Sequence, residues 1–270
     1  LGAWDSDPTF SDLPFLAGYS LDQAIDRAGV AHALVYTERG VVYAKAGNPL
    51  VQTVIDSRLA GSIAGSTPAA GLSIAVDGNG TPQVAYADPA ARTLRYATIR
   101  AGRWVTETVV VENEAVPAGD WFAAIALVPG NRPSILYAFT GQSQGRSAYF
   151  WTRINLARFN GTRWEITPVD QPGGEAESEV DVAINADGWV HLAWYDSYET
   201  ALNYRLIRPD GSALTVVVDR DWDVGQNPSL ALDTFGQPHI SYVDATHYDL
   251  KHAYIPITVT ASVYLPTVRK

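Results

Sequence analysis

The chain has 270 residues with 29 acidic and 19 basic side chains, and its formal net charge of −10 argues against nucleic acid or an anionic membrane as a partner. It contains no cysteine, which excludes disulfides, thiolate metal sites and cysteine nucleophiles. Its apolar stretches, such as 121–128, are far shorter than the ~20 residues of a membrane-spanning helix. Because methionine is also absent, we expect Leu1 to be the end left by removal of a leader, and the protein to be secreted to the extracellular space or cell surface.

One motif recurs along the chain with a period of about 50 residues. The segments "SIAVDGNGTPQVAYAD" at 73–88 and "SLALDTFGQPHISYVD" at 229–244 share an Asp, a Gly three residues later and an aromatic residue two places before a closing Asp. The aligned turn positions are Gly29, Gly80, Asn131, Gly188 and Gly236. An alanine stands five residues before each of them, at Ala24, Ala75, Ala126, Ala183 and Ala231. A period of this length with several short strands is typical of a propeller of four-stranded blades.

We therefore predict an all-β fold, a five-bladed β-propeller of four-stranded antiparallel blades, in a single domain spanning 1–270. In chain order the expected parts are an N-terminal arm or strand, five blades, and a C-terminal strand or tail, at 1–18, 19–68, 69–116, 117–172, 173–222, 223–256 and 257–270. An insertion around 141–161 is expected to project from the third blade. An amphipathic helix over 20–35 is the alternative for the first repeat, since Ser20 and Gln23 mimic a capping box.

The repeat resembles the "SLALDxxGxPHISYxD" blades of exported bacterial proteins, and the whole pattern resembles the five-bladed β-propeller families, which include lectins and glycosidases. The resemblance runs from about Tyr19 to Tyr254 and implies the fold, whereas propellers host unrelated activities. The Asp and Gly of the turn also resemble the Asp box of sialidases. That box lies between the third and fourth strands, and this turn joins the first and second, so we transfer no sialidase chemistry.

Two carboxylates are the candidates for glycoside cleavage, which needs a pair of carboxyl groups ~5 Å or ~6.5–9.5 Å apart. Asp22 and Asp181 stand two residues before the alanines, and Glu179 lies on the same strand face as Asp181. The other three repeats carry serine or alanine at this position. The alternative is a solvated channel lined by short polar side chains, and we expect the protein not to be an enzyme.

Three aspartates in "DRDWDVGQN", Asp219, Asp221 and Asp223, are spaced like the first ligands of an EF-hand calcium loop. The glycine of this segment comes one place late, and the twelfth position is Leu230, which is not a carboxylate. We therefore expect neither a metal nor a cofactor.

Histidine also recurs near the start of the second strand, at His32, His191 and His239. Stacked sheets lie ~10 Å apart, so histidines of neighbouring blades do not reach one zinc ion at ~2.1 Å. We interpret them as structural.

Exposed tryptophans are the better binding signal, because the chain has 8 of them and sugar rings stack on indoles. Trp151, Trp189 and Trp222 are the ligand-binding candidates, with a neutral glycan as the ligand. The sequons at Asn79 and Asn160 fit either glycosylation or a tight Asn-Gly turn.

The two ends of the chain offer one strand too many for the fifth blade. Either the segment around Trp4 or 257–268 supplies its fourth strand, and the other is free to pair with a neighbouring subunit by β-strand addition. The assembly candidates are Trp4, Val259, Val263 and Tyr264. Our preferred hypothesis is a non-catalytic structural or adhesive surface protein that forms a filament. The alternatives are a lectin-like propeller and then a glycoside hydrolase.

Overall fold

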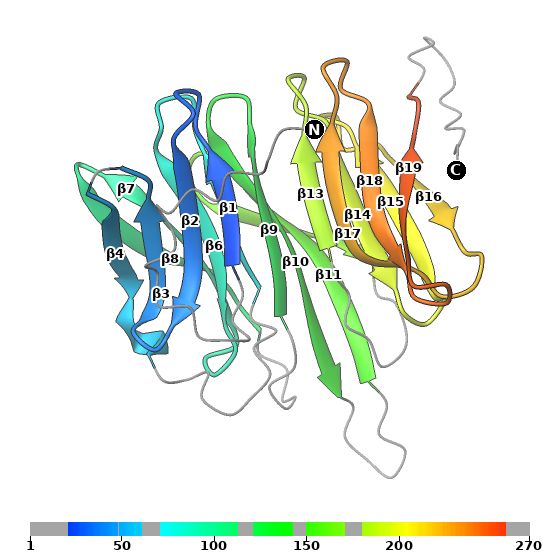
Figure 1. Ribbon diagram of the computed structural model, residues 1–270, viewed down its shortest axis with the longest axis horizontal. Coiled ribbons are helices and arrows are strands. Elements are labelled where there is room, and N and C mark those ends of the chain that lie inside the picture. Colours follow the sequence, from blue (N-terminus) through cyan, green and yellow to red (C-terminus); the bar gives the residue numbers. More distant parts are fainter. Residues whose placement is uncertain are drawn as a thin grey trace. The chain divides into compact units, whose positions relative to one another are not determined.

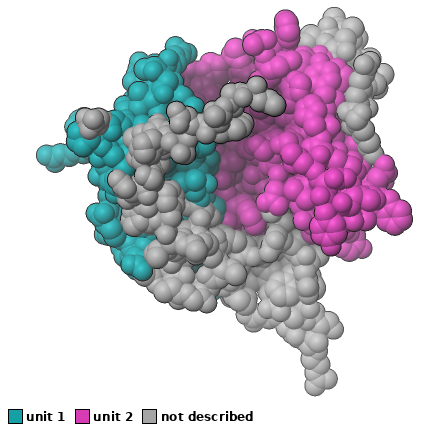
Figure 2. Space-filling model, viewed as in Figure 1, with its two compact units in different colours: residues 1–111 teal, residues 112–270 magenta. Residues whose placement is uncertain are grey.

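The computed structural model describes residues 21–47, 49–60, 71–112, 121–142, 150–170 and 180–257. The chain divides into two compact units, unit 1 at 1–111 and unit 2 at 112–270 (Figure 2). Each unit is built of antiparallel sheets whose strands follow one another in chain order. The candidates Glu179, Trp4, Val259, Val263 and Tyr264 lie outside the described residues.

Unit 1 contains two four-stranded sheets, which Figure 1 draws in blue and cyan. The first sheet consists of β1 (Leu21–Ile25), β2 (Ala31–Thr37), β3 (Gly40–Lys45) and β4 (Val51–Asp56), followed by the short 3-10 helix η2 (Ser57–Leu59). The second consists of β5 (Leu72–Val76), β6 (Pro82–Asp88), β7 (Thr93–Arg100) and β8 (Arg103–Val111). Their facing side chains form one apolar core that includes Leu34, Tyr36, Ile74 and Tyr86.

Unit 2 contains three further sheets. The third sheet of the chain consists of β9 (Trp121–Val128), β10 (Arg132–Gln142), β11 (Phe150–Phe159) and β12 (Trp164–Asp170). The fourth consists of β13 (Val180–Ile184), β14 (Val190–Asp196), β15 (Ala201–Ile207) and β16 (Ala213–Asp219). The fifth consists of β17 (Val224–Leu232), β18 (Pro238–Asp244) and β19 (Asp249–Tyr254).

The predicted fold class is confirmed, because the chain is an all-β protein of the β-propeller type with five successive antiparallel sheets. The fifth sheet has three strands among the described residues, and the segments expected to supply a fourth lie outside them. The helical alternative for 20–35 is wrong, since β1 and β2 form a hairpin in which Asp22 pairs with Leu34. In the described ranges no helix is long and apolar enough to cross a membrane.

The recurring Asp and Gly have a common structural cause. In four of the five sheets, an Asp or Asn side chain after the first strand accepts two backbone N–H groups of the following turn, as at Asp26, Asp77, Asn185 and Asp233. The glycine three residues later has a positive φ, for example +79° at Gly188. Side-chain bonds of this kind stabilise turns, and glycine takes the left-handed backbone without steric cost. The third sheet has Val128 and Asn131 instead, and Asn131 also has a positive φ of 59°.

The second strands of the second and fourth sheets are buried along their whole length. Every residue of β6 and of β14 is buried, because both faces of these strands are covered by neighbouring sheets or strands. Large aromatic side chains occupy equivalent positions in the second strands of four sheets, at Tyr86, Tyr137, Trp194 and Tyr242. In β6, β14 and β18 this residue stands two places before the end of the strand, so the turns 89–92, 197–200 and 245–248 begin beside the core.

Candidate functional site

Three connecting segments lie together at one end of the fourth and fifth sheets. We call them the aromatic edge, made of 197–200 between β14 and β15, 220–223 between β16 and β17, and 245–248 between β18 and β19. Thr200 Oγ1 donates to the carbonyl oxygen of Trp222 at 3.2 Å. The N–H of Asp223 donates to Thr246 Oγ1 at 3.0 Å, and its carbonyl oxygen accepts from the N–H of Ala245 at 2.9 Å. These bonds hold the three segments as one surface.

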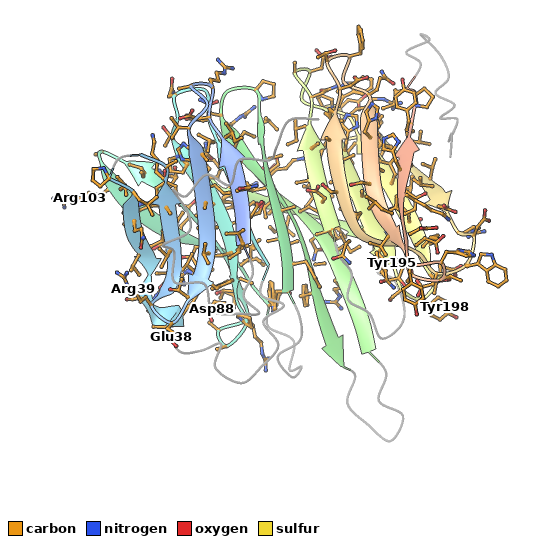
Figure 3. All side chains as sticks on the ribbon, viewed as in Figure 1. Glu38, Arg39, Asp88, Arg103, Tyr195 and Tyr198 are labelled. Atoms are coloured by element: carbon orange, nitrogen blue, oxygen red, sulfur yellow. The ribbon has the colours of Figure 1, made fainter. Side chains whose placement is uncertain are left out.

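Each segment of the aromatic edge presents an exposed ring. The exposed fraction is 69% for Tyr198, 71% for Trp222 and 92% for Tyr248. Figure 3 shows Tyr198 at this end of unit 2, close to Tyr195 at the end of β14. None of the three rings is part of the buried core, so packing does not account for them.

The backbone beneath two of these rings is unfavourable. Trp222 has a φ of +76° and Tyr248 a φ of +57°, in the left-handed region that bulky side chains rarely adopt. Backbone of this kind persists only where the surroundings impose it, and it clusters at ligand-binding sites. At Tyr248 this backbone belongs to the turn itself, since Arg92 and Thr200 occupy the same place in the β6–β7 and β14–β15 turns with φ of +54° and +48°. The left-handed backbone beneath the exposed ring of Trp222 is therefore the signal of function.

Polar groups lie among the rings of the aromatic edge. Asp223 accepts a hydrogen bond from the Tyr195 hydroxyl at 2.7 Å and a second from Gln226 Nε2 at 3.2 Å. Glu199 and Arg220 are both exposed, and Glu199 Oε2 lies 3.9 Å from Arg220 Nη2. The surface thus combines apolar ring faces with carboxylate acceptors and a guanidinium donor, which are the groups that sugar C–H faces and hydroxyls require.

An ionic network around two buried carboxylates, Asp219 and Asp244, lies next to the aromatic edge. Lys251 Nζ lies 2.7 Å from Asp244 Oδ2 and 3.5 Å from Asp219 Oδ2, and the Tyr242 hydroxyl donates to Asp219 at 2.9 Å. His247 Nδ1 lies 3.0 Å from Asp244. The hydrogen bond from Lys251 is the main reason that the pKa of Asp244 is far below its usual range, and the same bond raises the pKa of Lys251. Both groups are therefore charged at neutral pH and hold the turn 245–248 in place.

An equivalent network occurs at the corresponding end of unit 1. The Tyr86 hydroxyl donates to Asp56 at 3.0 Å, and Arg58 Nε donates to the same carboxylate at 2.8 Å. Figure 3 labels Glu38, Arg39 and Asp88 near this end of β2 and β6. Unlike the aromatic edge, the β2–β3 turn here exposes charged side chains, Glu38 and Arg39, and no ring. Among the described residues, the exposed rings at this end of the sheets belong to the fourth and fifth sheets.

The catalytic candidates Asp22 and Asp181 join neighbouring sheets. Asp22 Oδ2 accepts from Ser73 Oγ at 2.8 Å, and Asp181 Oδ2 accepts from the N–H of Leu230 at 2.7 Å. Asp22 belongs to unit 1 and Asp181 to unit 2. The structure thus gives each carboxylate a role in linking the first strands of two successive sheets.

The calcium candidates do not converge on one point. Asp219 is buried and bonded to Tyr242, and its Oδ1 accepts the N–H of Asp221, while Asp223 is bonded to Tyr195. In the described part of the chain, no group of three or more His, Asp or Glu side chains is arranged to hold a metal.

Of the predicted ring residues, Trp222 lies in the aromatic edge and Trp189 does not. Trp189 is half-buried against the core of unit 2, beneath the Arg208 guanidinium at 5.7 Å from the ring centre. The side chain of Trp151 lies outside the described atoms. Sequence reasoning missed Tyr198 and Tyr248, although each is an aromatic residue in a turn expected to be polar, and that was the available signal.

The histidines of the first and fourth sheets are structural. His32 Nδ1 lies 2.7 Å from the Tyr43 hydroxyl, and His191 Nδ1 lies 2.8 Å from that of Tyr204. Both histidines are fully buried, and burial lowers the pKa of His191 to about 4. They are therefore neutral packing residues at physiological pH.

Neither a protein-family model nor a curated protein matches the chain. Among solved structures, the chain is similar to a thermostable family-43 glycoside hydrolase at 8% identity, over 92% of this chain and 92% of that one, with a TM-score of 0.47. It is also similar to the endo-arabinase of Bacteroides thetaiotaomicron at 10% identity, over 91% and 96% of the two chains, with a TM-score of 0.46. A third similar structure is the SapL1 lectin with alpha methyl fucoside, at 9% identity, over 92% and 94%, with a TM-score of 0.39.

These comparisons contradict the expectation that the protein is not an enzyme. Glycoside hydrolases and arabinanases are prominent among the similar structures, beside fucose lectins. The expectation relied on how few carboxylates recur from repeat to repeat. That criterion fails because propeller chemistry resides in side chains of single blades and loops, which the repeat does not preserve. At these identities the likeness concerns the fold, and it specifies neither a reaction nor a substrate.

Proposed function

We propose that the chain is a carbohydrate-active β-propeller protein that binds a neutral glycan at the aromatic edge. The observation that carries this proposal is Trp222, a residue that is 71% exposed on a backbone with a φ of +76°. An exposed ring on strained backbone adds nothing to the core, and it offers a flat apolar face to a ligand.

The chemistry of the aromatic edge fits a sugar chain better than a charged polymer. Tyr198, Trp222 and Tyr248 offer ring faces to the C–H surfaces of pyranose or furanose rings. Asp223 and Glu199 accept hydrogen bonds from hydroxyl groups. The net charge of −10 repels polyanionic glycans, which leaves neutral ones.

A glycan array followed by calorimetry on the best ligand tests this proposal. We expect Trp222→Ala to weaken binding by about tenfold or more, because ring stacking is worth ~1–3 kcal/mol per ring for nucleobases and ~1.4 kcal/mol corresponds to tenfold. Phe235→Ala is the matched control, since Phe235 is 84% exposed in the turn at the opposite end of β17. Equal losses in both variants, or no glycan bound at all, would overturn the proposal. Assay of the bound glycan for new reducing ends determines whether it is also cleaved.

Self-association is a separate proposal that rests on β19. This strand is the outer strand of the fifth sheet among the described residues, and its Leu250 is 77% exposed. The outer strand of a sheet pairs readily with a strand from another chain where nothing covers its edge. We expect deletion of 1–18 or of 258–270 to reduce the mass measured by light scattering at high concentration. If the full-length chain and both truncated chains are equally monomeric, strand exchange is excluded.

A further inference from the structure

Two histidines of the fifth sheet face each other with their ring nitrogens in contact. His239 on β18 and His252 on β19 place Nδ1 and Nε2 3.0 Å apart, with ring centres 5.2 Å apart. The side chain of His239 is 37% exposed and His252 is also exposed, so solvent reaches the pair.

The same position in other sheets holds a tyrosine in place of the second histidine. His32 faces Tyr43 and His191 faces Tyr204, with Nδ1 to hydroxyl distances of 2.7 Å and 2.8 Å. In both sheets the tyrosine hydroxyl and the imidazole form a buried hydrogen bond. The fifth sheet alone among these three brings two imidazoles together, at a place where the core does not cover them.

A carboxylate lies near the far side of the His239 ring. Asp233 Oδ2 lies 3.7 Å from His239 Nε2, as Asp26 Oδ2 lies 3.3 Å from His32 Nε2. This arrangement favours the tautomer with its proton on Nε2, so that the Nδ1 lone pair of His239 points toward His252. Histidines that bind metals almost always have such a carboxylate or carbonyl partner on their other nitrogen.

We propose that His239 Nδ1 and His252 Nε2 bind a divalent transition-metal ion of the kind that prefers imidazole, such as Zn²⁺. Two ligand nitrogens each ~2.1 Å from a tetrahedral ion are ~3.4 Å apart, so the pair must open by only a few tenths of an ångström. Binding replaces the proton between the two rings, and water fills the remaining coordination positions. The acidic net charge of −10 favours the cation.

Calorimetric titration of zinc chloride into the full chain near neutral pH tests the site. We expect one ion bound per chain. In His252→Tyr the affinity for zinc should fall by at least about tenfold, and tyrosine is the residue that stands at this position in the first and fourth sheets. Asp233→Asn should weaken binding by about 10- to 100-fold, since loss of such a partner has that effect. Asn185 makes the same turn bonds in the fourth sheet, so this variant keeps the turn.

A spectroscopic readout separates this site from other zinc sites. In ¹⁵N-detected imidazole spectra, the free protein should show His252 with its proton on Nε2, and zinc should move that proton to Nδ1. His247→Gln serves as the control and should leave the isotherm unchanged, because His247 bonds Asp244 at another place on the sheet. Unaltered zinc binding in His252→Tyr, or no binding by the unmodified chain, would show that the pair is only a hydrogen bond.

Discussion

Asp22 and Ser73 occupy the same position in successive repeats and bond to each other, with Asp22 Oδ2 2.8 Å from Ser73 Oγ. The same carboxylate oxygen accepts the N–H of Ile74 at 2.9 Å, and Asp181 accepts the N–H of Leu230 in the same way in unit 2. An aspartate at this position therefore joins the first strands of successive sheets, through the Ser73 hydroxyl and the Ile74 N–H in unit 1 and through the Leu230 N–H in unit 2.

The first prediction concerns this link. Asp22→Ala leaves the Ile74 N–H and the Ser73 hydroxyl without this acceptor, so we expect the free energy of unfolding to fall by about 1–3 kcal/mol. Ser73→Ala removes one bond and should cost about 1 kcal/mol. Urea denaturation of the two variants and of the double variant measures the coupling, and strictly additive losses would contradict a direct link.

A second prediction uses the buried histidine of the fourth sheet. Burial lowers the pKa of His191 to about 4, whereas in the unfolded chain it is ~6.5, so the unfolded state binds a proton first as the pH falls. The contribution of neutral His191 to the free energy of unfolding is therefore complete above pH ~6.5. It is lost as the pH falls toward 4, and the loss is roughly 2 kcal/mol at pH 5.

His191→Gln should remove this dependence, because Gln83 occupies the equivalent position in β6 and accepts the Tyr96 hydroxyl at 2.7 Å. The measurement is the free energy of unfolding from urea denaturation at pH 7 and at pH 5 for both proteins. An identical pH dependence in the two would mean that the pKa of His191 is the same in the folded and the unfolded chain.

A third prediction concerns acid sensitivity at the base of the aromatic edge. Because the pKa of Asp244 is depressed in the folded state, its stabilising effect is present above the unfolded value of ~3.9 and is lost as the pH falls below it. Lys251→Met removes the main cause, so we expect lower stability at neutral pH and a flatter pH dependence below pH 4. Arg39→Met, at an exposed turn of unit 1, should leave the acid profile unchanged.

The fourth prediction separates function from stability at Trp222. Trp222→Gly removes a left-handed backbone penalty of roughly 1–2 kcal/mol, which the greater freedom of glycine in the unfolded chain partly offsets. We expect the thermal midpoint to be unchanged or slightly raised while glycan binding is lost. A clear drop in the midpoint would show that the indole stabilises the fold and would weaken its assignment to a ligand.

The fifth prediction compares two glycines with similar backbone. Gly225 has a φ of +108°, and a Cβ there would lie 2.7 Å from the backbone of Leu202 on β15. Gly211 has a φ of +87° with open space around it. Gly211→Ala should cost about 1 kcal/mol from backbone strain alone, and Gly225→Ala clearly more, because β17 must also move away from β15. If urea denaturation shows the same loss in the free energy of unfolding for both variants, β17 moves away from β15 without an energetic cost.

The sequence predicted the fold because its repeats form similar local interactions, and four of the five copies share the same side-chain bonds in the turn. The Asp or Asn at Asp26, Asp77, Asn185 and Asp233 closes a turn within five residues, and the apolar second strands must be buried on both faces. These interactions join residues that are close together in the sequence, so a recurring sequence pattern is enough to predict them.

Only the tertiary structure brought together the residues of the aromatic edge and the histidine pair. Trp222 was predicted from composition, but its neighbours Tyr198 and Tyr248 lie on separate turns that meet through bonds such as Thr200 to Trp222. The partner of Asp22 lies 51 residues away. Sequence reasoning treated each repeat as a unit and judged chemistry by what recurs, whereas the sites are formed by side chains that differ between repeats. Contacts between successive sheets depend on packing in three dimensions, and this packing determines which of the differing side chains face each other.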